Sequence, residues 1–166
     1  MERQIVLSRI IAQLGEIQGN RNLQKLFYLI QSLGYPLGYS FEWNTDGPVA
    51  PKLEQDIEEA ISLGLVHKSF HNDFPIYSLN RKFNSEYIYN KFQTTILPND
   101  LETKLKRIQH LLSQVGWKNL VTIASLSYLQ DIKGYKLSEA KFNLLSLSSN
   151  HTNEELDFLG NVLIQI

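Results

Sequence analysis

Hydrophobic residues recur every three or four positions over most of this chain, which is the spacing of one face of an α-helix. In the first half of the chain this pattern predicts helices over about residues 2–16, 23–33 and 51–63. In the second half it predicts helices over about residues 84–94, 98–115, 117–131, 137–146 and 153–165. Gly116 stands between two of these, where a left-handed glycine would end a helix. The pattern therefore predicts a mostly helical protein.

Two stretches of the first half carry the alternation of a β-strand instead. Tyr39, Phe41 and Trp43 alternate with polar residues, which predicts a short strand ended by the Thr-Asp-Gly-Pro turn that follows. Residues 65–70 and 75–79 predict the two strands of a β-hairpin. This region is therefore expected to mix helices with strands.

The order of these elements predicts the fold class. Two helices, a short strand, a third helix and a hairpin follow one another in residues 1–82, an order typical of a winged helix-turn-helix. Strand signals fade after residue 82, and residues 83–166 read as an all-helical unit. We expect an α+β, mostly helical protein, in which the helical unit packs on the winged-helix-like unit to form one compact domain.

Composition narrows the class of protein. The chain has 166 residues, 43% hydrophobic and 20% charged, which is ordinary for a globular domain. It has no cysteine, so disulfides and cysteine-based zinc sites are excluded. No signal-peptide cleavage pattern is seen, and no apolar run approaches the ~18 residues of a membrane span. We expect a soluble, cytoplasmic protein.

Catalytic chemistry finds no support in the sequence. No phosphate-cradling glycine loop and no nucleophile elbow is present. His67 and His71 lie close together in the chain, but a metal site needs a third well-spaced ligand. We therefore predict no enzyme activity, no catalytic residue, no metal and no cofactor.

A winged helix suggests either nucleic acid or another protein as its partner, and the charges of the chain distinguish between the two. The formal net charge is −1, and the helix expected to read DNA bases carries Glu54 and Glu58. Carboxylates at that position repel a phosphate backbone. If nucleic acid is bound, we expect the contacts to come from Lys68, Arg81 and Lys82, on the hairpin and just after it.

A protein partner is the function that these charges favour. We predict an interface made by Tyr39, Phe41 and Trp43 together with Glu54 and Glu58, since aromatic residues are common interface anchors. The same aromatic residues are also suited to packing in the core or to stacking on bases. The expected function is a non-catalytic regulatory or adaptor module that binds another protein or its own copy. The alternative is a winged-helix transcriptional regulator that binds DNA.

Four stretches carry a resemblance to a known family. They are LQKLFYLIQ at residues 23–31, GPVAPKL at 47–53, LGLV at 63–66 and IASLSYL at 123–129. Together they resemble the YwgA-type family of uncharacterised bacterial and archaeal proteins. The plan is also similar to that of the Panacea (SocA-like antitoxin) domain. Asp46 and Lys52 depart from the pattern, which has a tyrosine and an acidic residue there. The resemblance implies a winged-helix-like fold and, through the Panacea domain, a role in toxin–antitoxin or defence systems.

Overall fold

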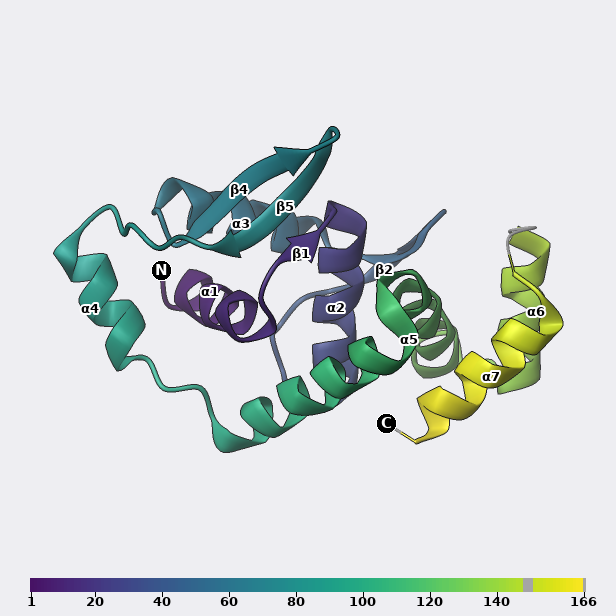
Figure 1. Ribbon diagram of the computed structural model, residues 1–166. Coiled ribbons are helices and arrows are strands. Elements are labelled where there is room, and N and C mark those ends of the chain that lie inside the picture. The colour runs from purple at the N-terminus through teal and green to yellow at the C-terminus, as the bar shows by residue number, and fades with distance from the viewer. Residues whose placement is uncertain (148–150, 166) are drawn as a thin grey trace.

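The computed structural model describes residues 1–147 and 151–165, and this part of the chain is α+β (Figure 1). Its helices are α1 (Glu2–Leu14), α2 (Asn20–Ser32), α3 (Pro51–Ser62), α4 (Glu86–Thr94), α5 (Asn99–Asp131), α6 (Leu137–Leu147) and α7 (Asn153–Ile164). Its strands are β1 (Ile17–Gln18), β2 (Glu42–Asn44), β3 (Gly47–Val49), β4 (Val66–His71) and β5 (Phe74–Leu79). The predicted α+β, mostly helical class is confirmed.

A three-stranded antiparallel sheet joins the start of the chain to the predicted hairpin. Its strand order is β1-β5-β4, and Ile17 lies opposite Tyr77. The two-residue β1 was not predicted, because a strand this short cannot show alternation. It forms because Gly19 donates its backbone N–H to the Pro75 carbonyl at 2.7 Å, which draws the α1–α2 connection against β5. The order of helices and strands over residues 2–79 is compatible with a winged helix.

The tip of the β4–β5 hairpin is a two-residue turn. Asn72 and Asp73 have φ angles of 48° and 65°, in the left-handed region that two-residue hairpin loops require. Asparagine and aspartate tolerate this conformation better than most residues do, so the turn forms without the usual glycine. The predicted hairpin is confirmed.

A second hairpin replaces the single predicted strand. Thr45 and Asp46 turn the chain, and β3 then pairs back on β2 with Trp43 opposite Pro48. The strand ends at the predicted turn, but the turn is made by Thr45 and Asp46 alone, and Gly47 and Pro48 belong to β3 instead. The expected strand also began too early. The Gln31 side chain bonds both backbone groups of Tyr39, which leaves none for a strand partner.

Helix α2 forms the centre of the molecule, and the second half of α5 packs along it (Figure 1). Every residue from Leu23 to Ile30 is buried, so this helix is covered on all sides. The predicted break in α5 is present, because Gly116 has φ 72° and ψ 171°. This break aims the two halves of α5 differently, and the second half contacts both α2 and β3.

Three helices lie outside this centre. Helix α4 packs on α1 at one end of the molecule, while α6 and α7 pack on α5 at the other (Figure 1). Helix α7 starts at Thr-Asn-Glu-Glu, residues 152–155, a sequence that predicts a capping box. The structure confirms it, with Thr152 Oγ1 accepting from the Glu155 N–H and the Glu155 carboxylate accepting from the Thr152 N–H. Among residues 1–147 and 151–165, none of the helices combines the length and apolar character needed to cross a bilayer.

Candidate interaction surfaces

Polar side chains of α2 hold the segment that contains the β2–β3 hairpin. Gln31 bonds the N–H and the carbonyl of Tyr39 at 3.0 and 2.7 Å. Gln24 makes the same two bonds to the backbone of Ala50, at 2.9 and 3.3 Å. Each glutamine thus acts as a short strand partner, and the segment between them is fastened to α2 at both ends.

A buried lysine fastens the middle of this segment. The side chain of Lys25 is 0% exposed, and its Nζ donates to the Pro48 carbonyl at 2.8 Å. Burial lowers the pKa of Lys25 to about 8, with a smaller contribution in the same direction from Arg21 and an opposing one from Asp46. The sequence signal for this residue was a lysine inside an otherwise apolar run. Only the structure shows that Lys25 is enclosed, because other elements cover α2 on every side.

A second buried charge joins α1, α3 and the segment before β2. The Asp56 side chain is 2% exposed and accepts hydrogen bonds from Tyr39 at 2.9 Å and Arg3 at 3.3 Å. Lys52 contacts the other carboxylate oxygen at 3.0 Å. Burial alone would raise the pKa of Asp56, but the hydrogen bonds from Lys52, Tyr39 and Arg3 outweigh it and lower the pKa. This carboxylate therefore acts as a structural anchor.

Of the aromatic residues predicted for a protein interface, Phe41 and Trp43 pack against α2 and α5, while Tyr39 contacts α1 and α3. Tyr39 is 4% exposed, and Phe41 and Trp43 are half-buried. Phe41 meets Tyr28 edge-on at 5.2 Å between ring centroids, and Trp43 lies 5.6 Å from Tyr128. Most of their surface is therefore used to pack the hairpin onto the helices, with only parts of Phe41 and Trp43 open to a partner.

The predicted acidic residues lie on the exposed face of α3. Glu54 and Glu58 are one helical turn apart, and both are exposed. Glu58 forms an ion pair with Lys68 of β4 at 2.7 Å, and this hydrogen bond raises the pKa of Lys68. The structure thus brings together a residue predicted for nucleic acid and one predicted for a protein partner. The charge of Lys68 is balanced by α3.

An exposed phenylalanine lies on the same face of the sheet as Lys68. Phe70 is 66% exposed and lies two residues after Lys68 on β4, so both side chains leave the same face of the sheet. Sequence reasoning placed Phe70 in the hairpin but did not select it as a site residue. The sequence already showed that Phe70 shares one face of the strand with Val66 and Lys68, because the three residues are two positions apart. Only the fold shows that no described element covers it.

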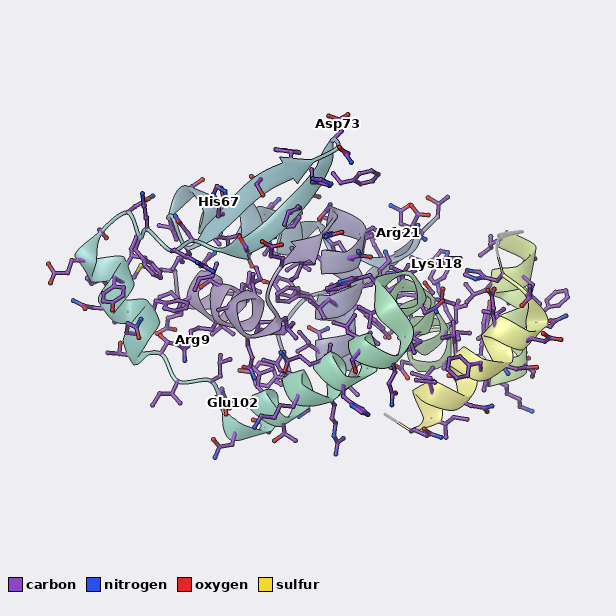
Figure 2. All side chains as sticks on the ribbon, viewed as in Figure 1. Arg9, Arg21, His67, Asp73, Glu102 and Lys118 are labelled. Atoms are coloured by element: carbon purple, nitrogen blue, oxygen red, sulfur yellow. The ribbon has the colours of Figure 1, made fainter. Side chains whose placement is uncertain are left out.

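Arg81 and Lys82 lie apart from this region, directly after β5. Both side chains are exposed, and neither makes a hydrogen bond or ion pair within residues 1–147 and 151–165. They line a cleft with His67, which Figure 2 labels on β4 above α1. Of the three residues predicted to contact nucleic acid, the structure leaves these two unpaired.

The histidines of the hairpin are directed away from α3. His67 lies opposite Ser78 and His71 opposite Phe74, on the sheet face that Lys68 does not share. Figure 2 shows the hairpin tip, marked by Asp73, at the far end of this strand pair from His67. Within the described part of the chain, no group of three or more histidine, aspartate or glutamate side chains is placed to hold a metal ion.

Comparison with known proteins gives a distant similarity over most of the chain. A scan against protein families finds no match to this chain. The chain is 21% identical over 155 residues to the protein named "Uncharacterized protein YwgA" from Bacillus subtilis (strain 168), covering 91% of this chain and 88% of the relative. This distant relationship spans nearly the whole length of both chains. It supports the resemblance to a YwgA-type uncharacterised family, while the similarity to the Panacea domain stays a prediction.

Proposed function

We propose that this protein is a non-catalytic regulatory or adaptor module that docks another protein through Glu54, Glu58 and Phe70, here called the docking surface. The observation that carries this proposal is an exposed phenylalanine on the sheet face whose Lys68 pairs with Glu58 of the exposed acidic face of α3. Buried aromatic anchors contribute much of the affinity in many protein interfaces, and flanking charges steer the encounter. The exposed parts of Phe41 and Trp43 lie outside this surface and are a secondary contact in the proposal.

The chemistry of the docking surface selects its partner. Carboxylates at the rim favour a partner that presents lysine or arginine side chains around an apolar pocket for Phe70. A two-fold self-contact through the same surface would bring the glutamates of both copies together, and like charges at an interface are repulsive. The proposed occupant is therefore a different, basic protein, and a toxin–antitoxin or defence role is the setting in which such a module would act.

To test this proposal, the partner is captured from the native host and purified, and its affinity for the protein and its variants is measured. Glu54→Gln with Glu58→Gln removes both charges at constant shape, and Phe70→Ser removes the anchor. We expect each change to weaken binding at least tenfold by calorimetry, and the glutamine pair also to reduce the salt dependence. Glu42→Gln is the matched control, since Glu42 is an exposed glutamate on β2.

Two results would count against the docking surface. One is a captured partner whose affinity for the glutamine pair and for Phe70→Ser equals that for the unchanged protein. The other is a dimer, seen by light scattering, that Phe70→Ser converts to monomers, because the occupant would then be a second copy.

DNA binding is the second candidate, and the two unpaired cations Arg81 and Lys82 favour it. Lys68 contributes less in this arrangement, because its charge is balanced by Glu58. A gel shift on duplex DNA at several salt concentrations tests it. Retained affinity in the double variant Arg81→Gln, Lys82→Gln would exclude these two residues as the phosphate contacts.

A further inference from the structure

A cleft of about 540 Å³ lies between the carboxyl end of α1 and the open end of the β4–β5 hairpin, where β4 begins and β5 ends. Its volume is in the range of small-molecule sites in proteins. The cleft is lined by Ala12, Glu16, His67, Leu79, Arg81 and Lys82, among others. None of them belongs to the docking surface, so the inference stands apart from the proposed function.

The two walls of the cleft have opposite polarity. His67, Arg81 and Lys82 offer hydrogen-bond donors and positive charge on the hairpin side. The carboxyl end of α1 lies on the other side, with Gly15 and Glu16 in the lining. The carbonyls at a helix end carry a partial negative charge, which adds to the Glu16 carboxylate. This side favours a hydrogen-bond donor or a cation.

The remaining lining is largely apolar. Ala12 and Leu79 form its accessible apolar surface, while Ile11 is fully buried. Small-molecule sites commonly combine such an apolar lining with a few polar groups that orient the ligand. A bare inorganic anion would use the cationic wall alone and would leave the apolar surface and Glu16 without a role.

From this geometry we infer that the cleft binds a small organic molecule whose apolar body carries an anionic group at one end and a hydrogen-bond donor at the other. The anionic group pairs with Arg81 and Lys82, the donor meets Glu16, and the body covers Ala12 and Leu79. An aromatic amino acid and a nucleotide with an exocyclic amine both have this chemistry. The first supplies a carboxylate and an ammonium group, and the second a phosphate and an amine.

Titrations of the full-length ¹⁵N-labelled protein followed by NMR test the inference. The probes are L-phenylalanine, AMP, IMP, which lacks the exocyclic amine, and inorganic phosphate. We expect saturable shifts at the amides of Glu16, His67 and Arg81 with phenylalanine or AMP. We expect at least tenfold weaker binding in Arg81→Gln, Lys82→Gln. Lys91→Gln is the control, since Lys91 is an exposed cation on α4, outside the cleft.

A second variant tests the opposite wall. Glu16→Gln should weaken phenylalanine binding, or should remove the preference for AMP over IMP, while the remaining spectrum reports an intact fold. The inference is overturned if no organic probe gives saturable shifts. It is also overturned if phosphate alone binds as tightly as AMP, since the cleft would then hold an adventitious ion only, or if the Arg81 and Lys82 substitutions leave binding unchanged.

Discussion

Lys25 and Pro48 are joined by a 2.8 Å hydrogen bond in which a fully buried ammonium group donates to a backbone carbonyl of the β2–β3 hairpin. No carboxylate lies within ion-pair distance of this lysine in the described part of the chain. The bond holds the hairpin against α2, and α5 packs on both of them. Burying the charged form of Lys25 therefore costs folding free energy. Because the fraction of charged Lys25 depends on pH, the stability of the fold depends on pH as well.

The first prediction concerns this pH dependence. The folded-state pKa of Lys25 is about 8, below the unfolded model value of 10.5, so between these values only the unfolded chain binds the proton. Stability therefore rises with pH across this window. Relative to Lys25→Met, the unchanged protein should gain about 2 kcal/mol between pH 8 and pH 10. Urea unfolding at several pH values measures the difference, and parallel curves for the two proteins would contradict it.

The second prediction concerns the close approach of Gly47 to α5. Gly47 has φ 101°, and a Cβ there would overlap the Ser125 hydroxyl. Gly47→Ala should cost about 3 kcal/mol, from the left-handed backbone together with the overlap. Adding Ser125→Ala removes the overlap but not the backbone strain, so it should restore about 1 kcal/mol or more. A double-mutant cycle by chemical denaturation measures this coupling, and purely additive effects would show that the contact is absent.

A third prediction concerns the buried carboxylate of Asp56. Asp56→Asn should destabilise the protein by about 3 kcal/mol at neutral pH, because Arg3 and Lys52 lose their partner and the amide replaces a strong acceptor. Tyr39→Phe removes one donor and should cost about 1–2 kcal/mol.

Acid titration separates the charge of Asp56 from simple packing. The pKa of Asp56 is lowered in the folded state, so its contribution is present above the unfolded pKa and is lost as pH falls through the folded value. The unchanged protein should lose more stability than Asp56→Asn on acidification below about pH 4. Equal acid sensitivity of the two proteins would show that this carboxylate is not stabilised by the fold.

The fourth prediction concerns the hairpin turn. Asp73 has φ 65°, a conformation that glycine adopts without strain. Asp73→Gly creates an Asn-Gly turn and should stabilise the hairpin by about 0.5–1 kcal/mol, while Asp73→Val should destabilise it because a β-branched residue is strained there. Thermal unfolding gives the order of the three proteins, and a valine variant as stable as the glycine variant would rule out the left-handed turn.

Local pattern was a good guide to the helices. The spacing of Leu23, Phe27 and Ile30 predicted α2, and the Thr152–Glu155 pair predicted the start of α7, because both depend on neighbours a few residues apart. The same reasoning failed for β1 and β3. These strands have two and three residues, and they exist because of partners elsewhere in the chain.

The candidate sites also have features that the sequence shows and features that only the structure shows. The acidic face of Glu54 and Glu58 was visible in the sequence, since residues four apart share one side of a helix. The pairing of Lys68 with Glu58 and the burial of Lys25 were not, nor was the cleft that unites Glu16 with Arg81. Sequence alone determined the order of the helices and the charge of their faces, because these depend on local spacing. Only the tertiary structure decided which charges are paired, buried or free, because that depends on contacts between residues distant in the chain.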